Sequence, residues 1–153
     1  MCGVIGYIGS KGSPDFLFNG LKRLEYRGYD SAGIAVLNKK NSVTIIKAEG
    51  KLINLKNKLS ALPKLVTLGI GHTRWATHGK PSEQNAHPHE SEQFVLLHNG
   101  IIENFMQLKV KLQSIGYIFL SNTDTEVISH LLSMELSSKK TINISHRHSS
   151  QQC

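Results

Sequence analysis

The sequence predicts an α+β fold in which layered sheets are covered by helices. The first observation is a set of short apolar, β-branched runs, each bounded by glycine, proline or polar turn residues. The second is a pair of such runs, 32–37 and 43–48, which are separated by the polar turn 38–42 and therefore predict a hairpin. The third is that segments with helical periodicity fall between groups of strands.

The individual elements follow from the same patterns. Strands are predicted over residues 2–8, 32–37, 43–48, 66–70, 94–97 and 117–120. Helices are predicted over residues 13–24, 51–62 and 104–115, and from residue 123 to 136. Ser13 and Pro14 form a cap followed by a first-turn proline, and Pro63 ends the second helix. Thr123 and Glu126 have the spacing of a capping box.

The length and composition indicate one globular domain. The chain has 153 residues, of which 39% are hydrophobic, enough for a substantial core. We place the domain at residues 1–136. Residues 137–153 are rich in serine and have only Ile142 and Ile144 as large aliphatic residues. Such a segment cannot offset its ordering entropy by burial, so we predict a flexible tail there.

Charge, cysteine and histidine patterns exclude several classes of protein. The net charge of +7 is spread along the chain without an arginine-rich run, so we expect no nucleic-acid binding. No apolar run approaches the ~20 residues of a membrane span, and no signal peptide is visible. The two cysteines, Cys2 and Cys153, lie at the ends of the chain and fit free thiols in the cytoplasm. The histidine spacing matches no familiar zinc signature, so we expect no metal and no cofactor.

Cys2 is the first candidate catalytic residue. It precedes Gly3 and a buried strand. Removal of Met1 would leave a thiol and a free α-amino group on the same residue. The α-amino group has a pKa of about 8, so it can accept the thiol proton near neutral pH. The alternative is an incidental buried cysteine.

Three further segments carry groups suited to binding. Arg74 offers a planar fork for a carboxylate, and the neighbouring Trp75, Thr77 and His78 could cover or line a site; Trp75 could equally pack in a core. Asn99 and Gly100 supply two N–H donors that can converge on one oxygen, as an oxyanion hole requires, or form a simple hairpin turn. Asp124 could bind an ammonium group or only favour a helix N-terminus. Residues 26–33 could form a turn with an Arg–Asp pair.

Taken in order, these motifs resemble the glutaminase domain of the glutamine–fructose-6-phosphate aminotransferase family, also called glucosamine-6-phosphate synthases. The segments that carry the resemblance are 2–6, 24–33, 71–79, 85–89, 98–104 and 123–126. The resemblance covers residues 1–136 and implies an N-terminal-nucleophile hydrolase fold, a four-layer αββα sandwich. Amidophosphoribosyltransferase-type domains share the Cys2–Gly3 start but are less similar around Trp75–His78 and Asn85–His89.

The resemblance also implies a role for each residue. Cys2 would be the nucleophile of glutamine hydrolysis, with Asn99 and Gly100 as the oxyanion hole. The α-carboxylate of the substrate would be bound by Arg74, Thr77 and His78. Its α-ammonium group would be bound by Asp124. Trp75 would belong to a closing loop, and Arg27 would order the loop near Cys2. His87 matches a family histidine without an assigned step.

The same resemblance sets the scope of the expected activity. In the family, ammonia passes to a sugar-phosphate isomerase half that makes glucosamine 6-phosphate, and the proteins are typically homo-oligomeric. This sequence lacks that half, and its sandwich is expected to be incomplete at the C-terminal end. We therefore weigh an active glutaminase module against a catalytically inactive fragment, and against the glutaminase domain of an amidophosphoribosyltransferase-type enzyme.

Overall fold

A four-stranded antiparallel sheet forms the centre of the molecule. The computed structural model describes residues 2–91 and 94–149, with the side chains of Lys11 and of residues 138–149 excepted. The strands lie in the order β1-β4-β2-β3. Their bounds are Gly3–Gly12 for β1, Ser31–Leu37 for β2, Val43–Glu49 for β3 and Val66–Arg74 for β4. The predicted hairpin is confirmed, because β2 pairs with β3 in register from Ser31↔Glu49 to Leu37↔Val43.

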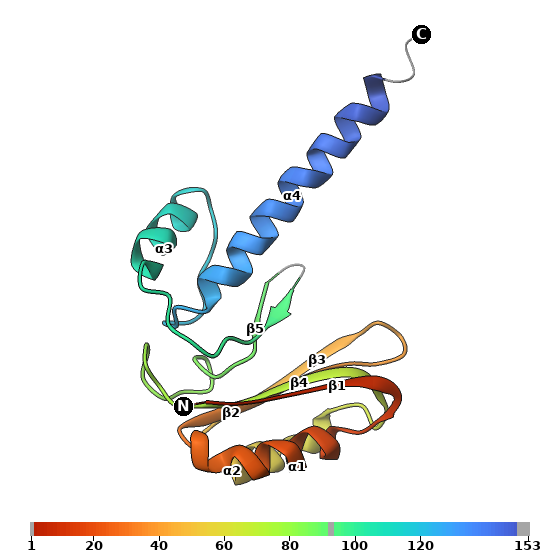
Figure 1. The fold of residues 1–153 in the computed structure, drawn as a ribbon, viewed down its shortest axis with the longest axis vertical. Helices are drawn as coiled ribbons and strands as arrows, with labels where there is room; N and C mark the ends of the chain where they lie inside the picture. The colour runs from red at the N-terminus through yellow and green to blue at the C-terminus, as the bar shows by residue number, and fades with distance from the viewer. Residues whose placement is uncertain (1, 92–93, 150–153) are drawn as a thin grey trace.

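One face of this sheet is covered by short helices (Figure 1). The helices are α1 (Pro14–Leu24) and α2 (Leu52–Lys56), with the 3-10 turns η1 (Glu25–Arg27) and η2 (Leu59–Ala61). The core lies between helices and sheet, where Leu17, Leu21 and Leu55 are fully buried. Burying a leucine side chain contributes roughly 1.5–3 kcal/mol, so this layer supplies much of the stability of the domain.

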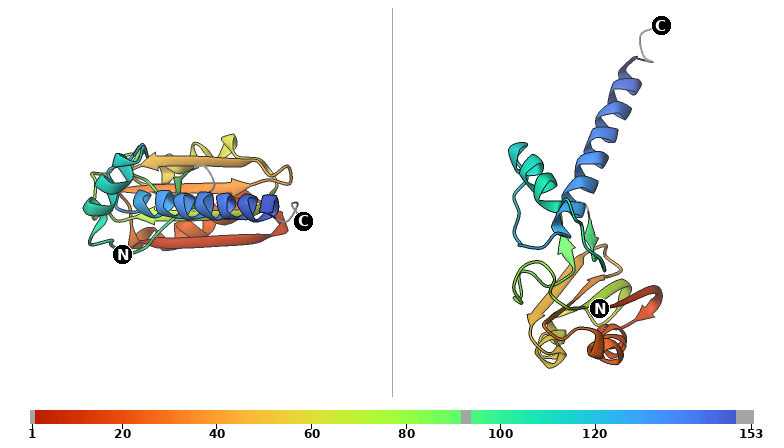
Figure 2. Two further views of the ribbon diagram at one scale, coloured as in Figure 1. Left: turned by 90° about the horizontal axis from the view of Figure 1, so that it is seen from above. Right: turned by 60° about the vertical axis from the view of Figure 1, so that its left-hand side comes forward.

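The second layer sits on the opposite face. It contains a ribbon of β5 (His89–Glu90) and β6 (Val95–Leu96), and the helices α3 (Phe105–Ser114) and α4 (Glu126–Ser149). Figure 2 shows that α4 points away from the sheet, while α1 and α2 remain on the far side. The order is therefore helices, sheet, two-stranded ribbon and helices. This arrangement confirms the predicted α+β class and its layered design.

Gly33 on β2 allows the two layers to meet. A Cβ atom at Gly33 would lie 2.1 Å from the carbonyl oxygen of His87 and 3.0 Å from that of Ile46. Only a residue without a side chain permits this approach of the backbone of the His87 segment. The His87–Pro88 peptide bond of this segment is cis.

Part of the upper sheet face carries exposed apolar side chains. Val4 and Ile8 of β1 pair with His72 and Leu68 of β4, so these four side chains share one face. Ile8 is 83% exposed, and Val4 and Leu68 are also exposed, whereas His72 is fully buried. The upper layer therefore covers the end of the sheet near Arg74 and leaves the other end open.

Several predicted elements differ from the structure. Residues 117–120 form no strand, and Ile118 and Leu120 are exposed, because no neighbouring strand of the described chain pairs with them. Residues 51–62 form α2 and η2 instead of one helix. Helix α4 continues to Ser149, beyond the boundary predicted at residue 136, and residues 150–153 of the predicted tail lie outside the described residues. Helices of the described chain are all too short or too polar to cross a membrane.

Candidate active site

A cavity of about 270 Å³ lies where the start of β1, the end of β4 and two loops of the upper layer meet. Seven of the predicted site residues line it. They are Cys2, Arg74, Trp75, Thr77, Asn99, Gly100 and Asp124. The cavity is also lined by residues for which the sequence predicted no part in binding or catalysis: His98, Ile101, Thr123 and Thr125. His87, which had no assigned step, is also in the wall.

Cys2 immediately precedes β1, and its position is fixed by the neighbouring strand β4. The N–H of Gly3 donates to Thr73 Oγ1 at 3.1 Å. The Cys2 Sγ accepts the N–H of Trp75 at 3.3 Å and lies 3.8 Å from the Trp75 carbonyl oxygen. Cys2 is a free, partly buried thiol. It is therefore held in the cavity wall and open to a ligand.

Asn99 lies beside the nucleophile candidate. Its Nδ2 donates to the carbonyl oxygen of Cys2 at 3.5 Å, and Gly100 follows in the same loop. Asn99 and Gly100 are exposed to the cavity side, and neither belongs to a strand or helix. An amide N–H₂ and a backbone N–H next to a thiol are the donors that a developing oxyanion needs.

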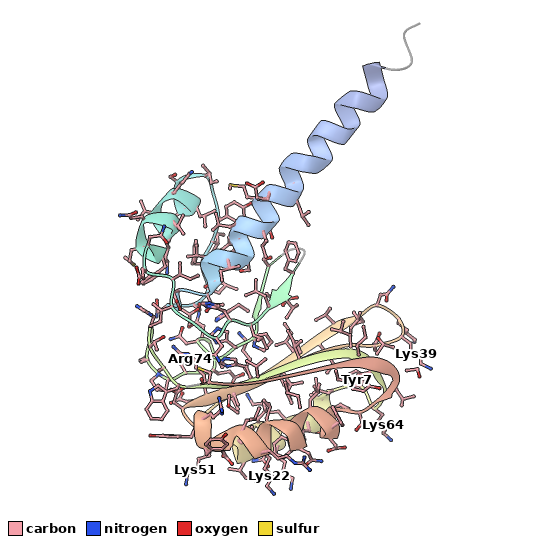
Figure 3. The ribbon with its side chains drawn as sticks, in the orientation of Figure 1. Tyr7, Lys22, Lys39, Lys51, Lys64 and Arg74 are labelled. Atoms are coloured by element: carbon pink, nitrogen blue, oxygen red, sulfur yellow. The ribbon has the colours of Figure 1, made fainter. Side chains whose placement is uncertain are left out.

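Arg74 is the last residue of β4 and is only 3% exposed. Its Nη2 donates to the carbonyl oxygens of His78 and Gly79, the latter at 3.0 Å. Its Nη1 is buried without a hydrogen-bond partner in the described chain. Figure 3 shows the side chain between the sheet and the upper layer. One edge of the guanidinium thus holds the loop, and the other is available to a carboxylate.

Burial also sets the electrostatics of Arg74. Desolvation lowers the pKa of the guanidinium, and the carboxylates of Asp30 and Asp124 oppose this effect. An arginine remains a cation under such a shift. A ligand carboxylate would therefore meet a buried positive charge with little competition from water.

Asp124 contributes the complementary charge. It is 3% exposed, and its Oδ2 accepts the N–H of Ile102 at 2.8 Å. It precedes helix α4, where the backbone N–H groups favour a carboxylate. The cavity therefore has a cation from β4 and an anion from the 123–125 loop, which suits the two charges of an α-amino acid.

Asp30, for which the sequence predicted no role in the site, anchors the loop after β4. Asp30 Oδ2 accepts the N–H of Ala76, and Asp30 Oδ1 accepts the hydroxyl of Ser31 at 3.1 Å. Trp75 is 47% exposed and meets Tyr29 edge to face, with ring centroids 5.5 Å apart. The only available signal was the position of Asp30 in the 26–33 motif, where the sequence suggested an Arg–Asp pair.

Two predicted residues lie outside the cavity wall. The His78 ring packs against Phe105, with centroids 4.9 Å apart, and its contribution to the site is the carbonyl that binds Arg74. Arg27 Nε donates to the hydroxyl of Tyr26 at 3.0 Å, and its guanidinium lies over that ring. An ordering role of Arg27 near Cys2 stays a prediction.

Three buried histidines form a series of ring contacts, here called the histidine stack, in which His72 and His87 are tilted and His87 and His89 meet edge to face; His87 also lines the cavity. The ring centroids of His72 and His87 are 4.4 Å apart, and those of His87 and His89 are 4.7 Å apart. Burial lowers the pKa of His72 to about 4 and that of His89 to about 3, with nearby cations adding to the effect. The pKa of His87 is lowered further by burial and by the two neighbouring histidines. All three rings are therefore neutral at physiological pH.

No group of three or more His, Cys, Asp or Glu in the described part of the chain is arranged to hold a metal ion. The expected absence of nucleic-acid binding stays a prediction.

Comparison with known proteins places this geometry among glutamine-dependent enzymes. Residues 61–142 match the family described as "Glutamine amidotransferase domain". The chain is 54% identical over 136 residues to glutamine–fructose-6-phosphate aminotransferase (isomerizing) of Haemophilus influenzae. It is 55% identical over 140 residues to the enzyme of that name from Helicobacter pylori. These matches cover 89% and 91% of the chain, which spans 22% and 23% of the relatives.

Solved structures give a consistent result. The glutamine phosphoribosylpyrophosphate amidotransferase from B. subtilis, complexed with ADP and GMP, is 32% identical and has a TM-score of 0.72. A structure described as the allosteric regulatory enzyme of purine biosynthesis is 32% identical and has a TM-score of 0.73. Each match covers 87% of this chain and 29% of the solved chain.

Proposed function

Because the chain belongs to the glutamine amidotransferase domain family, we propose that it hydrolyses the side-chain amide of L-glutamine to glutamate and ammonia. The observation that carries the proposal is the cavity that joins Cys2, Arg74 and Asp124. A thiol lies at one place in its wall, and opposite charges for an α-carboxylate and an α-ammonium lie at others.

The reaction begins with proton transfer within Cys2. Once Met1 is removed, the α-amino group accepts the thiol proton, and the thiolate attacks the side-chain carbonyl carbon of glutamine. The oxyanion accepts hydrogen bonds from Asn99 Nδ2 and the Gly100 N–H. The C–N bond then breaks, and ammonia leaves with the proton from the α-ammonium of Cys2. A thioester remains.

Water completes the cycle. It adds to the thioester carbonyl with the Cys2 α-amino group as base, glutamate is released, and the thiol is restored. Arg74 and Asp124 hold the substrate by its charged end throughout, with Thr77 in the cavity wall. Trp75 covers the site from the exposed loop. The chemistry needs a free thiol, which fits a reducing cytoplasm.

The fate of the ammonia is a separate part of the proposal. The similar proteins from Haemophilus influenzae and Helicobacter pylori are named for transfer to fructose 6-phosphate. We propose that ammonia from Cys2 serves the same transfer when a sugar-phosphate isomerase part is present. Identities of 54–55% to these relatives, against 32% to the glutamine phosphoribosylpyrophosphate amidotransferase from B. subtilis, favour this acceptor over an amidophosphoribosyl one.

The experiment measures glutamate and ammonia from the purified chain with L-glutamine, together with its intact mass. We expect equal amounts of the two products, loss of Met1 from the mass, and no release by Cys2→Ala. A chain that lacks Met1 and releases no more product than Cys2→Ala contradicts the proposal and supports the inactive-fragment alternative.

A further inference from the structure

The loop that carries Asp124 is held by hydrogen bonds of the two threonines that flank it. Thr123 and Thr125 flank Asp124 and are each 1% exposed. Thr123 Oγ1 lies 2.9 Å from His89 Nε2, and Thr125 Oγ1 lies 2.9 Å from His87 Nε2. Two neighbouring histidines of the stack therefore contact the two neighbours of Asp124.

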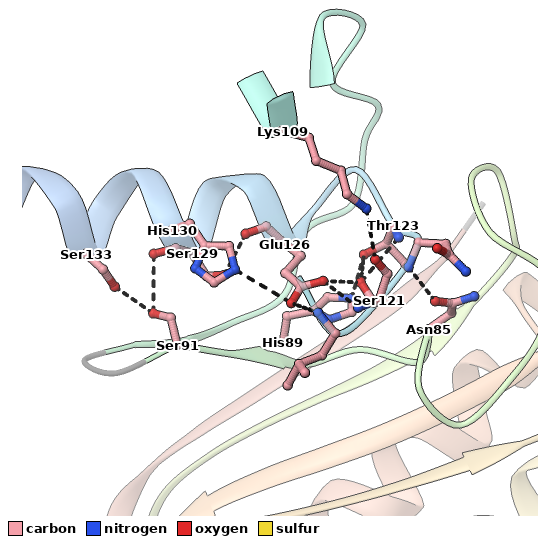
Figure 4. A network of polar contacts seen from close by, with 12 residues as sticks. Asn85, His89, Ser91, Lys109, Ser121, Thr123, Glu126, Ser129, His130 and Ser133 are labelled. Carbon is pink, nitrogen blue, oxygen red and sulfur yellow. Dashed lines mark hydrogen bonds and ion pairs between the residues drawn. The ribbon is translucent and has the colours of Figure 1, made fainter. Parts of the chain in front are cut away.

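The contact to His89 belongs to a longer polar chain that ends on a carboxylate (Figure 4). Ser121 Oγ donates to Glu126 Oε2 at 2.6 Å and lies 2.9 Å from Thr123 Oγ1. Since the Ser121 proton is used on Glu126, Ser121 accepts from Thr123, and Thr123 in turn accepts from His89. This series of hydrogen bonds requires His89 to be a neutral ring with its proton on Nε2.

Glu126 is well suited to end this chain. Its carboxylate also accepts the N–H groups of Leu120 and Ser121, each at 2.7 Å, and the residue is 2% exposed. It does not reach back to Thr123 as a capping box would require. Its hydrogen bonds instead fix the segment that enters the Asp124 loop.

The other side of the stack leads to Arg74. His72 stacks on His87 and lies on β4, two residues before Arg74. The stack therefore connects the strand that carries the buried cation with the loop that carries the buried anion. Rings that are buried and in contact with one another have few alternative positions, because packing in such a region is dense.

We propose that His87 and His89 are positioning residues, which hold Asp124 at a fixed distance from Arg74 by anchoring Thr125 and Thr123. This inference rests on the proposed function, in which Asp124 binds the α-ammonium of the substrate. His89 is the informative member, because it does not line the cavity and can reach Asp124 only through its contacts with Thr123 and His87.

The test compares two electrophiles that label Cys2. One is 6-diazo-5-oxo-L-norleucine, a diazoketone that mimics glutamine, and the other is the same diazoketone without its α-amino group. In the unmodified chain the ammonium contact should make labelling by the first faster. A hydrogen bond to a charged group contributes roughly 1.5–3 kcal/mol, so we expect a preference of about tenfold or more.

His89→Leu and Thr123→Val should each remove most of this preference. His89→Leu, which changes no residue of the cavity wall, should alter the rate of labelling by the des-amino probe less than about twofold. His89→Gln, whose amide can donate to Thr123, and Thr123→Ser should retain it. Ser91→Ala is the matched control, because it removes a 2.8 Å contact to Ser133 of α4 without touching the Asp124 loop.

The outcomes separate the two proposals. An unmodified chain that labels equally with both probes contradicts the ammonium site, and with it the proposed function. A preference that survives both His89→Leu and Thr123→Val overturns the positioning role and leaves the function standing. If the labelling rates of both probes fall equally in His89→Leu, the positioning role is also overturned, because a general loss of structure would then explain the slower labelling.

Discussion

Replacing Gly33 with alanine tests the contact between the two layers of the fold. The added Cβ would lie 2.1 Å from the His87 carbonyl oxygen and 3.1 Å from the carbonyl carbon. Both are backbone atoms, so the clash cannot be relieved by a rotamer change. Overpacking typically costs about 1–3 kcal/mol. Alanine also lowers the conformational entropy of the unfolded chain, which stabilises the fold by about 0.4–1 kcal/mol. Because the clash is severe, we take the upper end of the first range, about 3 kcal/mol, and expect Gly33→Ala to lower the free energy of unfolding by about 2 kcal/mol.

Gly6→Ala is the matched control for this change. Gly6 lies opposite Ile70 in the same sheet and on the same face as Gly33, and an added Cβ meets no atom within 4 Å. Urea unfolding should show Gly6→Ala unchanged or slightly more stable. The thermal midpoint of Gly33→Ala should fall by about 4–8 °C. Equal unfolding curves for the two variants would refute the close packing of the His87 segment on β2.

Three further predictions concern pH and the site. Folding lowers the pKa values of His72, His87 and His89, so the unfolded chain takes up protons at these residues at a higher pH than the folded chain does. The free energy of unfolding should therefore fall as the pH drops from 6.5 toward 4, by up to about 4 kcal/mol per pH unit. Urea unfolding at several pH values measures this, and a free energy that stays constant between pH 6.5 and 5 would contradict it. Asn99→Ala should lower kcat for glutamine hydrolysis about 10²–10³-fold with little change in KM, and a normal kcat would exclude it from the oxyanion hole. Asp124→Asn should raise KM for glutamine about tenfold or more, but should not raise KM for the glutamine analogue that lacks the α-amino group. Steady-state kinetics with both substrates measures the two values, and an equal rise for both argues against ammonium binding.

Much of the fold was predictable because its first half is local. The turn between β2 and β3 and the start of α1 at Pro14 are encoded by adjacent residues, and both lie where the patterns indicated. Ser13 is the N-cap residue of α1 but makes no side-chain capping hydrogen bond. The strand predicted at 117–120 failed because a strand needs a partner, and apolar residues such as Ile118 remain exposed without one. Glu126 shows a similar limit, since the capping-box spacing is local but its actual contacts are with Leu120 and Ser121.

The candidate site divides in the same way. Residues whose chemistry is distinctive, such as Cys2, Arg74 and Asp124, were predicted from type and motif, and the structure brings them to one cavity. Asp30 and His89 were not predicted, because their roles depend on hydrogen bonds to residues 46 and 34 positions away. Such pairings follow from the sheet and loop packing, which no single motif specifies.

The most direct test of the account is the site of covalent labelling by the glutamine-mimicking diazoketone. The chain has two cysteines, Cys2 and Cys153, and peptide mass spectrometry distinguishes them. We predict one adduct, on Cys2 of a chain that lacks Met1, and protection from labelling by L-glutamine. An adduct on Cys153 alone, or labelling of Cys2 that L-glutamine does not slow, would contradict Cys2 as the nucleophile of a glutamine site.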